Sequence, residues 1–349
     1  MRALVLREYK HLEVTDLPKP DPGAGEVLIR VAACGICGSD VHGYDGSSGR
    51  RIPPIVMGHE AAGVVEAVGS GVSSFQPGDR VTFDSTVSCG DCQFCLRGEI
   101  NLCDRRQVVG VSCGDYRRDG AFAEYIVVPE RILYRLPETM PFAEASMLEA
   151  VSVALHAVTV SGLRGQEAAL VIGAGMIGLL TLQAILAAGC SRVFVADIDD
   201  TRLQRARSLG AAEALRLSGD ALVRECLLLT GGSGVDVAFE AVGREETVAA
   251  AIDATRKGGT VTLIGNITPA VTLPLQKVVS RQIRLQGSAA SSGEYPRAIE
   301  LVSEGKIRVQ PMITAVAPLE EGPQWFERLY SGEPNLMKIV LAPWVEAAS

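Results

Sequence analysis

The sequence predicts a protein of two domains, an antiparallel β domain joined to an α/β domain built on a doubly wound parallel sheet. Three observations predict it. At 349 residues the chain is longer than one hydrophobic core usually serves. Short strands separated by turns fill about the first 150 residues. From residue 168 onward, apolar strands alternate with helical segments.

The first region contains alternating strands at 27–31 and 63–68, and a Pro-Gly-Asp-Arg turn introduces another at 81–83. These features are typical of a barrel-like antiparallel domain with irregular loops. The second region has candidate strands joined by helical connections, which predict the doubly wound parallel sheet. These strands lie at 169–172, 193–197, 214–217, 235–240, 260–264 and 283–286.

After residue 287 we expect one helix near 294–304 and one strand near 337–341. Two elements are too few for a third domain, so the chain is expected to return to the first. The predicted limits are therefore 1–152 with 289–349 for the β domain and 153–288 for the α/β domain.

Composition restricts the partners. A net charge of −8 argues against a nucleic-acid partner, whose phosphates need a basic surface. The sequence also lacks the basic amphipathic stretch that would predict binding to a membrane surface. The N-terminal apolar segment is interrupted at Arg7 and Glu8, too soon for a signal peptide. The apolar run at 176–188 is interpreted as a buried helix. Nine cysteines without a secretory signal predict a reducing compartment, hence a cytoplasmic location, where clustered thiols bind metal.

A glycine-rich turn, G-A-G-M-I-G at 173–178, follows the first strand of the second region and opens a helix. Gly173 would permit the tight turn, Gly175 a close backbone approach to a pyrophosphate, and Gly178 close helix–strand packing. The alternative is a purely structural strand-turn-helix. We predict a dinucleotide site, with Met176 and Ile177 among its contacts.

Asp197 ends the next predicted strand, 19 positions beyond the last glycine of the turn. A carboxylate there accepts hydrogen bonds from the ribose hydroxyls and repels a 2′-phosphate, so NAD is favoured over NADP. Arg202 is a counter-signal, because an arginine just beyond this strand can hold a 2′-phosphate. Neighbouring aspartates keep the local charge negative. The predicted cofactor contacts also include Val242 and Ile264, at the ends of two later strands.

Cys89, Cys92, Cys95 and Cys103 have two, two and seven residues between them. Four thiolates in so short a segment suit a tetrahedral zinc ion with no position left for a substrate, so a structural zinc is predicted. An iron–sulfur cluster uses the same ligands, but nothing else in the sequence indicates electron transfer. A nucleic-acid-binding zinc ribbon would need a basic surround, which this segment lacks.

A second set of possible ligands lies in the first region: Cys37, the pair His59-Glu60 after Gly58, and Glu149. One thiolate, one imidazole and one carboxylate with an open fourth position describe a catalytic, Lewis-acid zinc. Single His and Cys residues are more often packing residues. Here the chain has only four histidines, and His59 lies beside a carboxylate in a glycine-flanked turn.

Four motifs occur in order: G-I-C-G-S-D at 35–40, G-H-E at 58–60, the cysteine cluster at 89–103 and the glycine-rich turn at 173–178. Together they resemble those of the zinc-containing medium-chain dehydrogenase/reductase family, and the resemblance covers essentially the whole chain. It implies a GroES-like β-barrel catalytic domain and a Rossmann coenzyme domain.

Within this family the chain is similar to the polyol branch, which includes sorbitol and galactitol-phosphate dehydrogenases. F-A-E-Y at 122–125 and the stretch from Glu149 to His156 carry this similarity. The resemblance implies Cys37 and His59 as zinc ligands. It makes Glu60 a carboxylate that ligates zinc directly or lies just behind it, and Glu149 a further carboxylate that ligates directly or through water.

Two neighbours of the ligands are candidates for proton transfer. Ser39 could take the hydroxyl proton of an alcohol, and His42 could pass it to solvent, because a serine hydroxyl is too weak a base by itself. The alternative is that both are ordinary loop residues. Tyr44 could line the substrate site. His156 is interpreted as a core or cofactor-packing residue. The cysteines outside the predicted sites are read as small hydrophobes: Cys34, Cys113, Cys190 and Cys226.

The parts predict transfer of hydride between NAD and a secondary alcohol or ketone, with two zinc ions per chain and a polyol or sugar-like substrate. Sorbitol-type members carry an Arg-Tyr pair after the last Rossmann strand, and the aligned segment here, 287–295, has no arginine. That departure argues against sorbitol. A phosphorylated substrate would need cations, for which the candidates are Arg50, Arg51, Arg117 and Arg118.

The sequence leaves other functions open. A threonine or 2,3-butanediol dehydrogenase would share the motifs, and a non-catalytic NAD-binding sensor could use the same folds. A zinc-free quinone reductase of the same superfamily is disfavoured by Cys37 and His59-Glu60. From the family we expect a homodimer or homotetramer.

Overall fold

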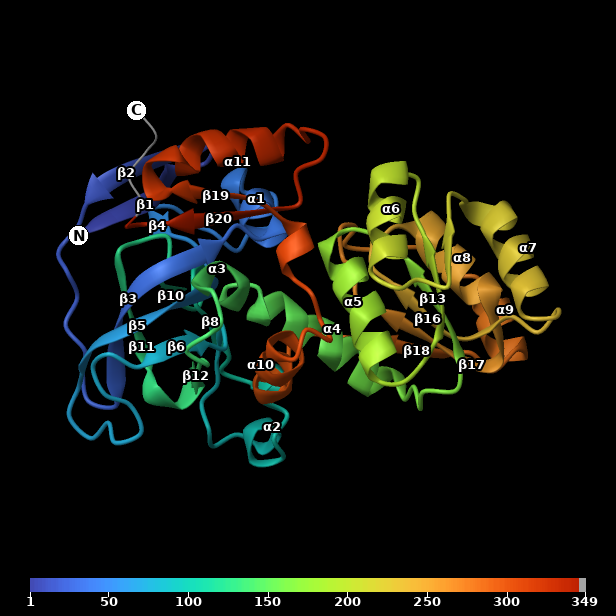
Figure 1. Cartoon of the computed structure of the whole chain (residues 1–349), viewed down its shortest axis with the longest axis horizontal. Coiled ribbons are helices and arrows are strands. Elements are labelled where there is room, and N and C mark those ends of the chain that lie inside the picture. The colour runs from blue at the N-terminus through green and yellow to red at the C-terminus, as the bar shows by residue number, and fades with distance from the viewer. Residues whose placement is uncertain (345–349) are drawn as a thin grey trace. The chain divides into compact units, whose positions relative to one another are not determined.

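The computed structural model describes residues 1–344, and the chain forms two compact units. The first comprises Met1–Glu149 and the chain from Val309 onward, and the second comprises Ala150–Arg308. The first unit contains the predicted antiparallel β domain and the second the predicted parallel sheet (Figure 1).

The main sheet of the first unit has the strand order β12-β6-β5-β3-β20-β19, and β11 also pairs with β3. Its pairs are antiparallel except β19–β20, which is parallel. The strands are β3 (Glu26–Gly35), β5 (Glu60–Val68), β6 (Arg80–Phe83), β11 (Tyr125–Pro129), β12 (Leu133–Arg135), β19 (Ile313–Pro318) and β20 (Lys338–Ala342).

Smaller elements cover this sheet. A second sheet has the order β2-β1-β4, and two further two-stranded sheets pair β10 with β9 and β7 with β8. These strands are β1 (Arg2–Glu8), β2 (His11–Asp16), β4 (Ile55–Val56), β7 (Thr86–Val87), β8 (Gln107–Val108), β9 (Val111–Ser112) and β10 (Arg117–Arg118). The helices are α1 (Gly38–Tyr44), α2 (Gln93–Leu96), α3 (Phe142–Ala145), α11 (Gly322–Tyr330) and the start of α4 (Leu148–Ser161).

The second unit holds a parallel sheet of order β15-β14-β13-β16-β17-β18. This order reverses direction at β13, as in a dinucleotide-binding doubly wound fold. The strands are β13 (Ala168–Ile172), β14 (Arg192–Ala196), β15 (Glu213–Leu215), β16 (Val235–Glu240), β17 (Thr255–Leu263) and β18 (Arg284–Gly287). The six predicted strands match them.

Five helices of the second unit fall into two groups. Helices α5 and α6 pack together, and α7 and α9 each pack on α8 (Figure 1). Helix α5 is apolar around most of its circumference because it is buried, as predicted. The helices are α5 (Met176–Ala187), α6 (Asp200–Ser208), α7 (Gly219–Leu229), α8 (Glu245–Ala254), α9 (Leu275–Ser280) and α10 (Tyr295–Ser303).

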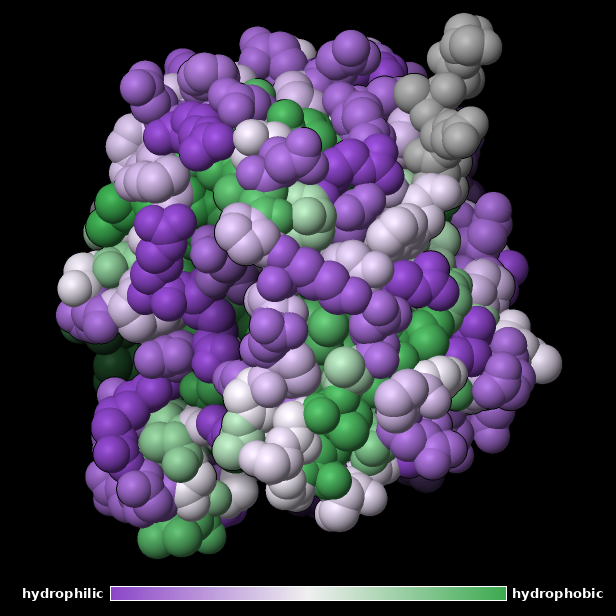
Figure 2. Space-filling view, turned by 90° about the vertical axis from the view of Figure 1, so that its left-hand side faces the viewer, coloured by the Kyte–Doolittle hydropathy of each residue, from purple (hydrophilic) through white to green (hydrophobic). Residues whose placement is uncertain are grey.

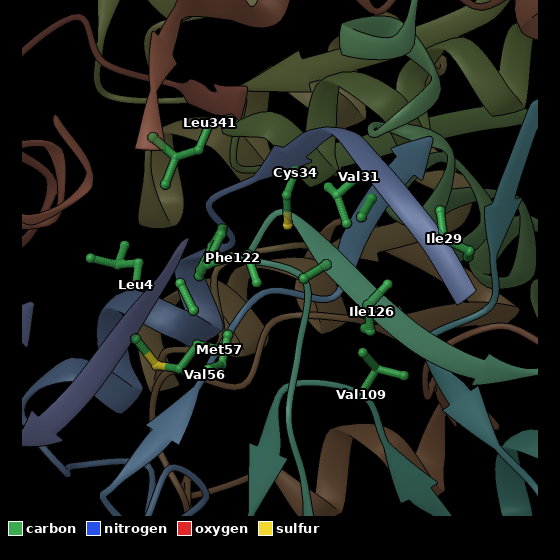
Figure 3. Packing of buried hydrophobic residues seen from close by; sticks show 14 of the residues in the cluster. Leu4, Ile29, Val31, Cys34, Val56, Met57, Val109, Phe122, Ile126 and Leu341 are labelled. Atoms are coloured by element: carbon green, nitrogen blue, oxygen red, sulfur yellow. The ribbon is translucent and has the colours of Figure 1, made fainter. Parts of the chain in front are cut away.

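Each unit has its own hydrophobic core. In the first, side chains from β1, β3 and β11 meet Phe122 and Met57, and Cys34 points into this cluster (Figure 3). Burial raises the pKa of the Cys34 thiol well above its ordinary value, which fits its interpretation as a small hydrophobe. The face in Figure 2 is mostly hydrophilic, with hydrophobic residues gathered in small patches.

Two expectations about the chain after residue 287 need correction. Strand β19 and helix α11 were not predicted, although α11 buries Phe326 in the core of the first unit. Residues 289–308, including α10, belong to the second unit, whereas the predicted limits give them to the first. Helix α10 buries Tyr295, Ala298 and Leu301. It packs as part of the second unit, and the chain returns to the first unit only after Arg308.

One segment, Phe142–Ser161, is long and apolar enough to cross a membrane by length and composition, but 67% of its most apolar window is buried inside the protein. That degree of burial is what a core helix of a globular domain shows, and core helices pass the same test of length and apolarity.

Candidate metal centre and dinucleotide site

The ends of β3 and β5 bring Cys37, His59 and Glu60 together. Because the two strands are antiparallel neighbours, the end of β3 lies beside the start of β5, and Gly35 pairs with Glu60. One ligand atom from each of the three side chains lies within 4.8 Å of the others. A Cβ on Gly35 would stand 2.5 Å from Glu60 Oε2, so glycine leaves room for this carboxylate.

A buried carboxylate, Asp40 on α1, supports two of these side chains. Its Oδ1 lies 3.4 Å from Nδ1 of His59, and its Oδ2 accepts the backbone N–H of Cys37 at 3.2 Å. With Nδ1 facing Asp40, Nε2 of His59 is the nitrogen available to a metal. Burial alone would raise the pKa of Asp40 and lower that of His59. Their attraction reverses both shifts, so the Asp40 pKa falls and the His59 pKa rises.

Glu60 is paired with a lysine that comes from the far end of the chain. Lys338 on β20 is 1% exposed, and its ammonium group donates to Glu60 Oε2 and, at 3.0 Å, to the Ile36 carbonyl. The other oxygen, Oε1, is buried without a hydrogen-bond partner among the described residues. Glu60 attracts the Lys338 ammonium and raises its pKa, although burial opposes that shift. An unsatisfied buried carboxylate oxygen beside a thiol and an imidazole fits a zinc ligand set.

Glu149, at the start of α4, does not join the three-residue group. Its Oε1 accepts from the Ser85 hydroxyl at 3.3 Å. Burial raises the pKa of Glu149 to about 7, and nearby His59 opposes the shift. Of the two roles implied by the resemblance, the geometry agrees with the one that lacks direct coordination.

The two candidate relay residues both lie on α1, three positions apart and exposed, and therefore on one side of the helix. The Ser39 hydroxyl is 3.4 Å from Nη2 of Arg51. Tyr44, predicted as a possible substrate contact, is instead buried, with its hydroxyl bonded to the Lys10 carbonyl and to Glu327. That prediction was wrong because the last turn of α1 faces the core.

Of the four arginines considered for a phosphate, Arg51 is unavailable. It is 4% exposed and paired with Asp40 at 3.0 Å. Arg117 lies 3.6 Å from Asp119, and Arg118 is 3.4 Å from the Gln107 side chain. Arg50 is exposed.

The four thiols of Cys89, Cys92, Cys95 and Cys103 converge within 4.8 Å of one another. The Cys92 and Cys95 sulfurs are 3.5 Å apart, and the Cys89 N–H donates to Cys103 Sγ at 3.3 Å. Backbone N–H groups, led by that of Cys95, lower the pKa of Cys92 to about 6. All nine cysteines are free thiols, so the cluster has the donors of a closed tetrahedral metal site.

In the second unit, the three glycines of the 173–178 turn have three different surroundings. Gly173 has φ of 98°, where a side chain is strained. A Cβ on Gly178 would lie 1.7 Å from the Gly173 carbonyl oxygen, whereas one on Gly175 would meet nothing within 4 Å. Gly175 is the N-cap of α5, so open space adjoins a helix N-terminus, which suits a phosphate.

The other predicted coenzyme residues lie at the carboxyl ends of the strands. Asp197 follows β14, and its carboxylate accepts the N–H of Ala174 at 2.6 Å and of Asp199 at 2.9 Å. Arg202 Nη1 is 3.9 Å from the same carboxylate. The remaining residues start α5 or follow β16 and β17: Met176, Ile177, Val242 and Ile264.

Sequence reasoning missed Glu240, the last residue of β16. It is fully buried, and its carboxylate accepts the N–H groups of Val242 at 3.0 Å and Gly243 at 2.9 Å. A Cβ on Gly265 would lie 2.3 Å from the Gly243 nitrogen, so the loops after β16 and β17 touch. An acidic residue ending an apolar strand was the available signal.

His156 bonds Glu294. Its Nδ1 is 2.8 Å from Glu294 Oε1, and both side chains are largely enclosed. Despite its burial, this partner and other hydrogen bonds lower the pKa of Glu294. The interpretation of His156 as a packing residue agrees with this contact.

Comparison with known proteins identifies the family. Residues 23–138 match the alcohol dehydrogenase GroES-like domain, and residues 177–304 match the zinc-binding dehydrogenase family. A zinc-type alcohol dehydrogenase-like protein of Escherichia coli K12, YdjJ, is 34% identical over 92% of this chain and 93% of its own. The Bacillus subtilis sorbitol dehydrogenase is 31% identical over 98% of this chain and 97% of its own.

Solved structures agree. An E. coli oxidoreductase of unknown specificity, ECK1772, superposes with a TM-score of 0.92 at 33% identity over 98% of each chain. A Sinorhizobium meliloti dehydrogenase bound to NADP gives 0.88 at 31% identity, over 98% of this chain and 99% of that one. An E. coli alcohol dehydrogenase with NADH gives 0.90 at 29%, again over 98% and 99%.

The chain therefore belongs to the zinc-type alcohol dehydrogenases of the medium-chain dehydrogenase/reductase family. Its similarity to sorbitol and galactitol-1-phosphate dehydrogenases places it in the polyol branch.

Proposed function

We propose that this protein is an NAD-dependent dehydrogenase that interconverts a secondary alcohol and a ketone, with a polyol or sugar-like substrate. The observation that carries the proposal is the convergence of Cys37, His59 and Glu60 beside Asp40 and Lys338. A thiolate, an imidazole and a carboxylate suit a catalytic zinc with an open position. The Cys89–Cys103 cluster would hold a second, structural zinc.

When bound by Cys37, His59 and Glu60, zinc supplies Lewis acidity that lowers the pKa of an alcohol hydroxyl. NAD, held at the 173–178 turn, supplies the hydride acceptor.

The chain's own residues orient the ligands and move the proton. Asp40 fixes the ring of His59, and Lys338 balances the buried charge of Glu60. Ser39 accepts the substrate proton as it releases its own hydroxyl proton, which His42, on the same side of α1, passes to solvent. Glu149 adds a second carboxyl group whose pKa lies near neutrality. His59 and Glu60 are themselves buried, which limits the water around the reacting hydroxyl.

Coenzyme choice rests on Asp197. Its carboxylate is anchored by two backbone N–H groups at the end of β14, where it can accept from ribose hydroxyls and oppose a 2′-phosphate. Arg202, at 3.9 Å from that carboxylate, is drawn toward Asp197, which leaves it less free to hold a phosphate. One similar structure holds NADP and another holds NADH, so the proposed choice of NAD depends on the Asp197 side chain.

A panel assay tests the proposal. Purified protein, with its zinc content measured, is offered secondary alcohols, free and phosphorylated sugar alcohols, threonine and 2,3-butanediol with NAD or NADP. We expect about two zinc ions per chain and NADH formation with a polyol. One zinc ion per chain and no dehydrogenation would refute the proposed enzymatic function and favour an NAD-binding sensor. Threonine or butanediol as the best substrate would reassign the substrate class.

Two properties complete the proposal. We infer a cytoplasmic location from the nine free thiols. We also infer a homodimer or homotetramer from the family, to be checked by light scattering.

A further inference from the structure

Arg51, in the turn between α1 and β4, is a buried cation that the proposed mechanism leaves unused. It is 4% exposed and meets Asp40, which is fully buried. Its Nη2 and Nε lie 3.0 and 3.3 Å from Asp40 Oδ1, and its Nη1 donates to the Arg50 carbonyl at 3.0 Å. The attraction between two buried charges barely offsets the free energy needed to desolvate them. The stability of the fold alone therefore gives little reason for a buried Arg51–Asp40 pair.

Helix α1 is shaped to admit this side chain. A Cβ placed on Gly43 would lie 2.1 Å from Arg51 Cγ and 2.9 Å from its Cβ. The stem of Arg51 therefore runs across the helix where a side chain would otherwise stand. Gly43 gives up helix propensity relative to alanine at a position where this packing leaves no room for a side chain.

The carboxylate that Arg51 holds is the one that accepts the backbone N–H of Cys37 and faces the imidazole of His59 in the metal centre. The same oxygen that receives the guanidinium, Oδ1, lies 3.4 Å from His59 Nδ1, and Oδ2 accepts the Cys37 N–H. Rotation of the Asp40 carboxylate would therefore disturb both ligands together. Two guanidinium N–H groups on one oxygen oppose that rotation.

Arg51 also reaches the candidate relay residue. Its Nη2 is 3.4 Å from Ser39 Oγ. A guanidinium only donates hydrogen bonds, so Ser39 must present a lone pair to it and direct its own hydrogen elsewhere. One cation thus sets both the Asp40 carboxylate and the Ser39 hydroxyl.

We propose that Arg51 is a positioning residue of the catalytic metal centre, which locks Asp40 so that Cys37 and His59 are preset for zinc and orients the Ser39 hydroxyl. This inference rests on the proposed function for the identity of the centre, but its main test does not need turnover.

The test follows the release of each metal ion to a chromophoric chelator. The zinc-loaded protein should release its two ions in separate phases, one from each ligand set. Loss of a residue behind the ligands typically weakens a metal site 10–100-fold. Arg51→Gln should therefore speed one phase by about 10–100-fold and leave the Cys89–Cys103 phase unchanged. The unchanged phase is an internal control for folding.

Arg135→Gln is the matched variant, because it removes an exposed arginine paired with Asp79 in the same unit. It should release both ions at the wild-type rates. Arg51→Lys, which keeps the charge without the paired donors, should fall between wild type and Arg51→Gln. If Arg51→Gln does not fold, Arg51→Lys decides alone: faster release from one site supports the proposal, and wild-type release overturns it.

Two other outcomes overturn the proposal: wild-type release by Arg51→Gln, and equal acceleration of both phases. Kinetics at saturating zinc add a second readout. Arg51→Gln should lower kcat with little change in KM, because Ser39 acts on the proton rather than on binding. If wild type oxidises none of the alcohols tested, the proposed function fails, but selective metal release would still support the role of Arg51.

Discussion

The candidate sites of the two units consist of different chemical groups. In the first, charged side chains buried in the protein face one another: Asp40, Arg51, Glu60 and Lys338 surround Cys37 and His59. In the second, the material is backbone, with glycines that leave space and carboxylates, Asp197 and Glu240, that receive N–H groups.

This difference follows from what each site must hold. A metal ion needs ligands at fixed distances, and partners behind the ligands keep them there at the cost of burying charge. A dinucleotide presents a long phosphate and ribose surface, which N–H groups and a helix N-terminus can meet without buried ion pairs. The first site should therefore be sensitive to charge, and the second to volume.

The largest effect is expected from Cys37→Ser. Loss of a ligand removes several kcal/mol of Lewis-acid stabilisation, so kcat should fall by roughly 10³-fold or more. Thermal unfolding of the chain should barely change. Cys92→Ser is the matched control in the other metal site, and it should lower the unfolding temperature while keeping most of kcat at low temperature. Wild-type activity in Cys37→Ser would refute the assigned ligand.

Removing the charge behind Glu60 should cost stability next. Lys338→Met leaves a buried carboxylate unpaired, which typically costs about 3–5 kcal/mol. Calorimetry should show the transition of the first unit at a lower temperature, with that of the second unit unmoved. Lys338→Arg keeps the charge and should recover part of the loss. An unchanged transition in Lys338→Met would mean that the first site tolerates uncompensated charge, contrary to the comparison.

Volume is the corresponding test in the second unit. Gly178→Ala forces a methyl group against the Gly173 carbonyl, 1.7 Å away, and should destabilise this unit by about 1–3 kcal/mol. Gly175→Ala adds the same methyl to open space. It should unfold like wild type yet bind coenzyme roughly 10–100-fold more weakly, as titration of NADH fluorescence would show. Equal stability losses in the two variants would contradict the assigned roles.

The smallest effect concerns the coenzyme. Asp197→Ala removes a charged acceptor for the ribose, worth about 1.5–3 kcal/mol, so the ratio of kcat/KM with NAD to that with NADP should fall by about tenfold or more. Asp200→Ala, which removes an exposed carboxylate paired with Arg216, should leave the ratio unchanged. Wild-type protein that already prefers NADP would overturn this assignment.

The local motifs could be predicted from the sequence, whereas the buried charge pairs of the first unit could not. The glycine turn and the four-cysteine cluster are local, so their spacing and immediate sequence context predicted what each could bind. Short strands separated by turns predicted one sheet, and apolar strands separated by helical segments predicted the other. Arg51 and Lys338 lie 11 and 278 positions from their partners. No periodicity links such residues, although a lysine at the start of an apolar strand is a signal that would have pointed to a buried partner.

The end of the chain was predicted least well for a related reason. Strand β19 and helix α11 are amphipathic and short. Strand β19 pairs with β20, whereas α11 packs on α1 and β2, which lie at the other end of the sequence. Tyr44 was misplaced because its role depends on Glu327, 283 positions away.

The position of β20 has a consequence for how the protein is made. A ribosome releases all of residues 150–308 before Lys338 emerges, so the second unit can fold while Glu60 still lacks its counter-charge. During that interval β3 has no β20 beside it, and the proposed first metal site lacks Lys338 behind Glu60. The proposed binding of zinc by Cys37, His59 and Glu60 would therefore be a late event in biogenesis, and a nascent chain stalled before residue 338 would acquire the cysteine-cluster ion first.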